Sequence, residues 1–286
     1  MRHLFVKDIK SIVIKVGTSV LTKNGRFDKK VIADLAGEIS KFLKKGIQVS
    51  IVSSGAIGGG MTIMKFRQRP TSMEELQAAA AVGQRYLMQC YEEAFFRHGF
   101  STAQVLLTWD DLAQKKRFMN AKHTLKQIQK WGLVPVINEN DTVATDEIRF
   151  GDNDRLSSLL AILEEADVLV ILSDTNGLYA GGDSKDKGKR IKIVERMGES
   201  IFAHVKDNKK AFTVGGMNSK LKAIYMSVSS GIPVFLADGR EQNVLTRIFE
   251  GEDIGTLFVP HLKKGQGRKS WLSHFVNHIK PARNKK

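Results

Sequence analysis

Residues 134–154 read VPVINENDTVATDEIRFGDND, and this stretch holds the most unusual chemistry of the chain. A short apolar run at residues 133–137 has the length and the β-branching of a buried strand. It ends in the polar cluster NEND, and after an excursion the chain returns as GDND, just before a helix predicted over residues 156–165. One cluster therefore follows a strand and the other begins a helix, and ligands bind at such places in open α/β sheets.

Two interpretations of these clusters remain open. Asn and Asp suit turns and helix caps, and this interpretation is sufficient for Asn153 or Asp154 alone. It explains the whole set poorly, because several carboxylates beside one apolar strand repel one another unless a cation lies among them. The candidate cations are an ammonium group on a substrate, a nearby lysine and a metal ion.

Three further segments place glycine or a lysine next to predicted strands and helices. Lys15 lies inside an apolar strand predicted over residues 11–16, which runs into GTS at 17–19. A charge is costly to bury unpaired, so Lys15 either extends to the surface or contacts a phosphate beside this turn. The amides and hydroxyls of GTS favour the contact with a phosphate.

A second strand, 48–52, meets SSGAIGGG at 53–60, where glycines let backbone amides approach an anion. The segment TVGGMNSK at 213–220 is not a Walker A motif, but it opens a helix reaching 229 and supplies Lys220.

The remaining pattern alternates strands with helices. Apolar spacing predicts helices over 30–45, 74–98 and 112–131, and strands over 103–107, 167–172, 233–237 and 256–258. The strand at 167–172 ends in SDTNGLY, which adds polar residues to the same ligand edge. This alternation predicts an α/β sandwich around a mostly parallel sheet.

Composition limits the class of protein. With 286 residues, 42% of them hydrophobic, the chain can bury a large core as one large domain or two small ones. No apolar run is long enough to cross a bilayer, the N-terminus lacks the apolar segment of a signal peptide, and the single cysteine, Cys90, cannot form an internal disulfide. These features predict a soluble cytoplasmic protein.

The net charge of +15 suggests nucleic-acid binding, but a tail at 261–286 holds eight basic and no acidic residues. Residues 1–260 therefore keep a net charge of only +7, which weakens that suggestion.

The motifs IKVGTS, VSSGA, NEND, GDND and GGMNSK, in this order, resemble those of the glutamate 5-kinases of the amino acid kinase family. The resemblance covers nearly all of residues 8–260, and the NEND and GDND pair is its most specific part. It implies a three-layer αβα sandwich around a mostly parallel eight-stranded sheet, with residues 1–260 as the kinase domain. The implied reaction is ATP-dependent phosphorylation of the γ-carboxylate of L-glutamate to L-glutamyl 5-phosphate, the first step of proline biosynthesis, with Mg²⁺ bound mostly by phosphates and water.

Residue roles follow from the same resemblance. The residues implied to bind ATP are Lys15, Gly17, Ser173, Asp174, Val214, Gly215, Gly216, Met217, Asn218, Ser219 and Lys220. Those implied to hold glutamate are Ser54, Gly55, Asp141 and Asn153, with Asp141 pairing with the substrate ammonium. Relatives commonly have Thr-Asp where this chain has Ser173-Asp174, and Ser-Thr-Lys at 218–220, and neither difference removes a needed donor.

The chemistry of the residues agrees with this reaction. A carboxylate is already ionised at neutral pH and needs no general base, so the task is to bring an anion to a polyanion by positioning and charge stabilisation. Lys15 and Lys220 suit that task as catalytic residues. Asp154, at a helix start, is predicted to orient both lysines. No protein metal ligand is predicted.

Two other functions stay open. An amino acid kinase for acetylglutamate or aspartate is the nearer one, although an acetylated substrate has no α-ammonium for an acid-rich pocket. A nucleic-acid-binding or regulatory protein on an inactive kinase scaffold is supported by the basic tail and opposed by the retained lysines and acids. The resemblance further implies a homo-oligomer (dimer or tetramer), feedback inhibition by proline and coupling to a glutamyl-phosphate reductase. Many relatives carry a C-terminal PUA domain, which the residues after 260 are too few to build.

Overall fold

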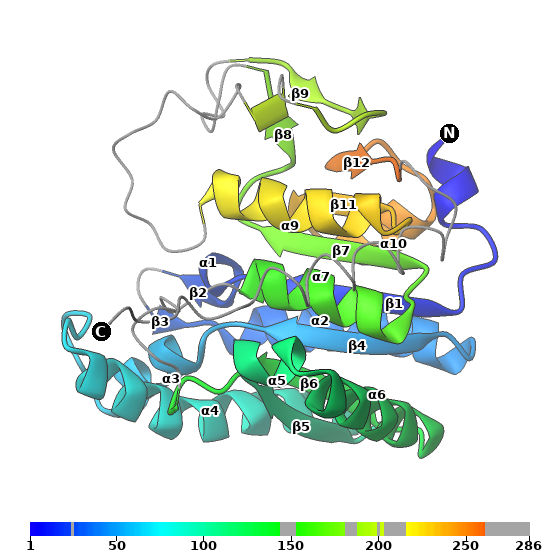
Figure 1. Ribbon diagram of the computed structural model, residues 1–286. Helices are drawn as coiled ribbons and strands as arrows, with labels where there is room; N and C mark the ends of the chain where they lie inside the picture. Colours follow the sequence, from blue (N-terminus) through cyan, green and yellow to red (C-terminus); the bar gives the residue numbers. More distant parts are fainter. Residues whose placement is uncertain (24–25, 144–152, 181–187, 199–200, 203–215, 261–286) are drawn as a thin grey trace, which may run out of the picture.

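The computed structural model describes residues 1–23, 26–143, 153–180, 188–198, 201–202 and 216–260. One sheet of eight strands lies between two layers of helices (Figure 1), in the strand order β10-β12-β11-β7-β1-β4-β6-β5. Its strands are β1 (Ser11–Val16), β4 (Gln48–Ser53), β5 (Thr102–Leu107), β6 (Val134–Glu139), β7 (Val168–Ser173), β10 (Ile193–Val194), β11 (Val234–Asp238) and β12 (Thr256–Phe258). Every neighbouring pair is parallel except β11 and β12. The predicted αβα sandwich around a mostly parallel eight-stranded sheet is confirmed.

Helices cover both faces of this sheet. The described helices are η1 (Arg2–Phe5), α1 (Thr18–Leu21), α2 (Lys29–Lys44), α3 (Ala56–Ile63), α4 (Met73–Phe96), α5 (Trp109–Ala113), α6 (Lys115–Lys130), α7 (Asn153–Glu164), α9 (Met217–Ser229) and α10 (Val244–Phe249). Two small ribbons pair β2 (Thr22–Lys23) with β3 (Arg26–Phe27), and β8 (Leu178–Tyr179) with β9 (Arg190–Ile191). None of the described helices is long and apolar enough to span a membrane.

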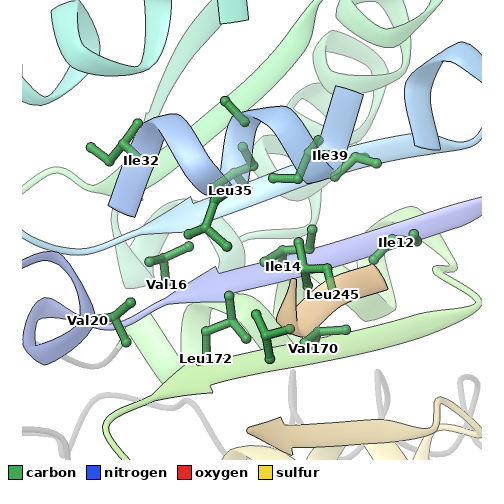
Figure 2. Close-up of a cluster of buried hydrophobic side chains, with 14 of the residues drawn as sticks. Ile12, Ile14, Val16, Val20, Ile32, Leu35, Ile39, Val170, Leu172 and Leu245 are labelled. Atoms are coloured by element: carbon green, nitrogen blue, oxygen red, sulfur yellow. The ribbon is translucent and has the colours of Figure 1, made fainter. Parts of the chain in front are cut away.

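The two faces of β1 explain why its sequence is almost continuously apolar. Ile12, Ile14 and Val16 point to one face, where they join a buried cluster with α2 and α10 (Figure 2). Val13 belongs to the opposite cluster, which α6, α7 and α9 complete. A parallel strand that is covered on both faces has no solvated side, so apolar residues at every position are favoured.

The parallel arrangement brings the carboxyl ends of several strands to one edge. Val16 at the end of β1 lies in register with Ser53 at the end of β4 and with Leu172 near the end of β7. Strands β6 and β11 run in the same direction on either side of this group. The polar segments that follow these strands in the sequence therefore meet at one edge of the sheet, as the sequence predicts.

Two local predictions were wrong. The glycines at 58–60 lie inside α3 rather than in a phosphate-binding loop, and their role is to allow close packing: a Cβ on Gly60 would collide with the carbonyl of Ala79 in α4. The single helix predicted over 112–131 is split into α5 and α6, because Thr108 and Asp111 form a capping box that starts α5 early. Gln114 is extended, with ψ of 118°, and separates the two helices.

Glu164, at the end of α7, has a carboxyl group whose burial makes the stability of the fold depend on pH. Its carboxylate accepts hydrogen bonds from Ser50 Oγ at 2.9 Å and from Gln129 Nε2 at 3.1 Å, but burial outweighs them and raises its pKa to about 7. The folded chain then keeps a proton that the unfolded chain, with a pKa near 4.5, releases, so stability falls as pH rises from about 4.5 to about 7.

Glu164→Gln removes this titration and keeps an acceptor for Ser50. We expect the variant to match the wild-type chain near pH 4.5 and to exceed its free energy of unfolding above pH 7 by roughly 3 kcal/mol. Urea denaturation at both pH values measures the difference. Glu165→Gln, at the exposed neighbour that pairs with Lys122, is the matched control. Equal stability of wild type and Glu164→Gln at pH 8 would contradict the expectation.

Candidate active site

Three charged side chains meet at the carboxyl edge of the sheet. Lys15 Nζ lies 2.5 Å from Asp154 Oδ1, and Lys220 Nζ lies 3.4 Å from Asp154 Oδ2. Asp154 is fully buried, and the two lysines are 4% and 8% exposed. Two cations therefore share one anion in a largely desolvated place, which leaves a net positive charge there. Such a place attracts a further anion, because charges interact more strongly away from water.

The fold positions each of these groups on a rigid element. Lys15 is the last residue but one of β1, Asp154 is the second residue of α7, and Lys220 lies in the first turn of α9. Helices α7 and α9 pack closely through small residues, with Ser158 Oγ donating to the carbonyl of Ala223 at 2.7 Å. Residues separated by more than 200 positions in the sequence are thereby held at one carboxylate, as the sequence predicts for Lys15, Lys220 and Asp154.

Two other predicted nucleotide-binding residues, Gly17 and Ser173, lie at the carboxyl ends of the neighbouring strands β1 and β7. Gly17 donates its backbone N–H to the carbonyl of Leu172 at 3.1 Å, and a Cβ at Gly17 would lie 3.2 Å from that same carbonyl oxygen, which is tighter than most Cβ contacts. Ser173 is buried at the end of β7, and its Oγ donates to Asp174 Oδ1 at 3.1 Å.

The glycine segment before α9 is described only from residue 216 onward. Gly216 caps α9, Met217 is buried, Asn218 is exposed and Ser219 is half-buried. Lys220 of this group reaches the charged centre. Val214 and Gly215 lie outside the described residues.

A second cluster, made of uncharged polar groups, adjoins the charged centre. Asn153 Nδ2 donates to Ser54 Oγ and to Asn138 Oδ1, both at 2.9 Å. Asn138 Nδ2 in turn donates to Gln84 Oε1 at 2.9 Å. These four side chains come from α7, the turn after β4, β6 and α4. Gly55 follows Ser54 with φ of +101°, a conformation that favours glycine and lets the chain turn directly into α3.

Asp141 follows the strand that carries Asn138, two residues after β6 ends. Its side chain is half-buried, and burial raises its pKa to about 6, with the charge of Arg69 acting in the opposite direction. A carboxylate whose pKa is raised in this way gains more from a cationic partner than an exposed one does. The site thus offers an acid that favours an ammonium group.

The two clusters are joined by consecutive residues. Asn153 belongs to the amide cluster and Asp154 to the charged centre, and their Cα atoms are about 3.8 Å apart by chain geometry. The first turn of α7 therefore places the positively charged centre directly beside the buried cluster of uncharged polar groups. Among the described residues no group of three His, Cys, Asp or Glu side chains could hold a metal ion.

Gln84 and Asn138 join the site although neither was assigned to it from the sequence. Asn138 stands in the NEND cluster, so its position after a buried strand was a usable signal. Gln84 had none, because it lies within a long amphipathic helix and meets Asn138 across 54 positions of sequence. Only the packing of α4 against the end of β6 brings the two together.

Comparison with known proteins agrees with this geometry. Residues 10–238 match the model of the amino acid kinase family. The chain is 45% identical over 263 residues to the glutamate 5-kinase of Chromohalobacter salexigens, covering 92% of this chain and 70% of the relative. It is 46% identical over 270 residues to the glutamate 5-kinase of Methylobacillus flagellatus, covering 92% of this chain and 72% of the relative.

A solved structure supports the fold independently. The UMP kinase from Bacillus anthracis superposes with a TM-score of 0.57 at 16% identity, over 89% of this chain and 97% of that chain. The family match spans most of the sequence, and the curated relatives share more than two fifths of their aligned residues with it. The chain therefore belongs to the amino acid kinase family and, within it, to the glutamate 5-kinases.

Proposed function

We propose that the chain transfers the γ-phosphoryl group of ATP to the γ-carboxylate of L-glutamate, which yields L-glutamyl 5-phosphate and ADP as the first step of proline biosynthesis. The observation that carries this proposal is the pair of lysines on Asp154, directly beside the cluster built on Asn153. The two lysines suit the phosphates of the donor, and the polar cluster suits an amino-acid acceptor. The similarity to glutamate 5-kinases over 92% of the chain supports the choice of acceptor.

The reaction asks little covalent chemistry of the protein. A γ-carboxylate oxygen attacks phosphorus, the bond from phosphorus to the bridging oxygen breaks, and ADP leaves with the electron pair, so no proton has to be removed. The ammonium groups of Lys15 and Lys220 offset charge on the transferred group and on the leaving oxygen. Asp154 keeps both ammonium groups at one point. When Mg²⁺ is bound with ATP it neutralises phosphate charge, and phosphates and water supply most of its ligands.

The acceptor pocket is proposed to recognise the amino-acid end of glutamate. Asn153 Oδ1 is a buried acceptor with no partner among the described residues, and Asp141, two residues after β6, offers a carboxylate. Both groups suit an ammonium group, which donates three hydrogen bonds. Ser54 Oγ accepts from Asn153, so its hydroxyl hydrogen is directed elsewhere and can serve a substrate oxygen.

Asp141→Asn is expected to raise KM for glutamate roughly 10–100-fold and to leave KM for ATP nearly unchanged, since one charged contact to the ammonium is lost. The pH dependence supplies a second readout. The carboxyl of Asp141 has a pKa of about 6, so it is protonated below that pH and can no longer attract the ammonium. In the wild-type chain kcat/KM for glutamate then falls about tenfold per pH unit below pH 6.

This fall of kcat/KM for glutamate below pH 6, the acidic limb of the pH profile, is expected to be absent from Asp141→Asn. Steady-state kinetics between pH 5 and 8, with each substrate varied in turn while the other is saturating, measure both effects. If KM for ATP rises as much as KM for glutamate, or if the acidic limb persists in the variant, Asp141 does not contact the ammonium.

Trapping the product tests the proposed reaction directly. With ATP, Mg²⁺ and glutamate, hydroxylamine converts an acyl phosphate to a hydroxamate, and we expect its formation to depend on all three components. Parallel reactions with acetylglutamate and aspartate separate this function from those of other amino acid kinases. Hydroxamate formation from acetylglutamate or aspartate alone would refute the choice of substrate.

Several further properties belong to the same proposal. Residues 1–260 form the kinase domain, the assembly is a dimer or tetramer, proline inhibits it, and a glutamyl-phosphate reductase consumes the labile product. The support for these properties is the similarity to glutamate 5-kinases. The basic segment 261–286 lies outside the described residues. Deleting it tests whether glutamate-dependent ATP turnover needs the tail.

A further inference from the structure

Gln84 is a buried member of the amide cluster and comes from α4, on the side of Asn138 opposite Asn153. It is 8% exposed, and Asn138, its partner, is 2% exposed, so water is excluded from the contact. Gln84 Oε1 accepts from Asn138 Nδ2 at 2.9 Å. Gln84 Nε2 is buried without a partner among the described residues. A buried amide with one unpaired donor lowers stability, so a role in folding alone is a poor explanation for it.

The amide contacts form a directional chain. An amide has one oxygen that accepts and one NH₂ group that donates, so each contact fixes the direction of the next. Gln84 Oε1 and the backbone N–H of Glu139 together require Asn138 to direct Nδ2 toward Gln84 and Oδ1 the other way. Asn138 Oδ1 then accepts from Asn153 Nδ2. The consequence is that Asn153 Oδ1, rather than Nδ2, is left over at the other end of the chain.

The packing of α4 against α3 lets Gln84 reach this position. A Cβ on Gly83 would collide with the carbonyl oxygen of Ala56, as one on Gly60 would with that of Ala79. The two helices therefore touch backbone to backbone at these glycines. Gly83 costs about 1 kcal/mol of helix stability relative to alanine. The close approach explains why glycine is needed next to Gln84.

We propose that Gln84 is a positioning residue for the amino-acid substrate. It fixes the amide of Asn138 and, through it, the amide of Asn153, so that an oxygen and not an NH₂ group faces the substrate ammonium. This inference rests on the proposed function, because it assigns the ammonium to Asn153. Gln84 itself touches no reacting atom. If Gln84 is removed, Asn138 Nδ2 loses its acceptor, and the amide of Asn138 is then held only at Oδ1, by the backbone N–H of Glu139 and by Asn153. Asn153 Oδ1 is then placed less firmly against the substrate ammonium.

The variant Gln84→Met keeps the size of the side chain and removes its acceptor. We expect KM for glutamate to rise roughly 10–100-fold, while kcat and KM for ATP stay within about threefold. The melting temperature is expected to stay close to that of the wild-type chain, because the unpaired donor of Gln84 is exchanged for an unpaired donor on Asn138. A residue with a merely structural role would change stability and both KM values together.

Two further variants complete the experiment. Gln84→Glu keeps an oxygen that accepts from Asn138, so it is expected to restore KM for glutamate to within a few-fold of wild type. Gln89→Met makes the same change at an exposed position on α4, where Gln89 donates only to Glu93, and is expected to leave all parameters unchanged. An unchanged KM for glutamate in Gln84→Met overturns the proposal, and so does a parallel rise of both KM values with a lower melting temperature. If the wild-type chain forms no hydroxamate from glutamate, the proposed function itself fails, and this result is distinct from either outcome.

Discussion

Lys15→Ala and Lys220→Ala variants are expected to turn over glutamate about 10²–10³ times more slowly than the wild-type chain, with smaller changes in KM for ATP. Both ammonium groups sit on Asp154 in a site with little exposure to water, where a fixed charge acts strongly on the charge that develops during transfer. Because the two lysines share one partner, the double variant is expected to lose less activity than the product of the two single losses.

Single-turnover and steady-state kinetics separate these effects on chemistry from effects on binding. Lys222→Ala is the matched control for Lys220, since Lys222 lies on the same helix and is exposed. It is expected to keep wild-type turnover. If either active-site variant changes only KM for ATP and keeps kcat, its lysine binds the nucleotide without stabilising the transfer.

Asp154→Asn is expected to lower the free energy of unfolding by about 3–5 kcal/mol, because it leaves two buried ammonium groups without a countercharge. The substitution keeps the shape of the side chain, so the loss is electrostatic rather than a matter of packing. ATP brings phosphates that replace the lost negative charge. We therefore expect ATP with Mg²⁺ to raise the melting temperature of Asp154→Asn by more than it raises that of the wild-type chain.

Thermal denaturation with and without ATP and Mg²⁺ measures this difference. Glu252→Gln provides a matched control, since the side chain of Glu252 pairs with Arg247 at 2.8 Å and both side chains are exposed. Its loss is expected to stay below about 1 kcal/mol, the usual range for ion pairs in contact with water. Equal destabilisation by the two substitutions would show that burial of Asp154 does not raise the energetic effect of its ion pairs.

Much of the fold followed from local pattern. The apolar strands at 11–16 and 48–52 and the polar segments after them predicted a parallel sheet with polar segments gathered at one edge, and the structure has this arrangement. A lysine inside a strand was unusual enough to mark Lys15, and its buried contact with Asp154 explains why it is tolerated there. Asp154 was predicted to orient both lysines from its position at the start of the helix that follows the NEND strand.

The rest depended on contacts between distant segments. Nothing in the run SSGAIGGG distinguishes a phosphate loop from a helix packed on another helix, and the close approach of Gly60 to Ala79 decides for the helix. The place of Gln84 in the site depends on the same helix pair. The raised pKa of Asp141 depends on how deeply its loop is buried, and residue type alone does not set that depth.

A crystal structure of the chain with a non-hydrolysable ATP analogue, Mg²⁺ and glutamate tests most directly whether α7 joins a phosphate site to an amino-acid site. We expect Lys15 Nζ and Lys220 Nζ within hydrogen-bonding distance of the terminal phosphate while both still contact Asp154. We expect the glutamate ammonium against Asp141 and Asn153 Oδ1, with its γ-carboxylate facing that phosphate. A terminal phosphate bound away from both lysines, or a glutamate with its ammonium directed away from Asn153, would contradict this arrangement.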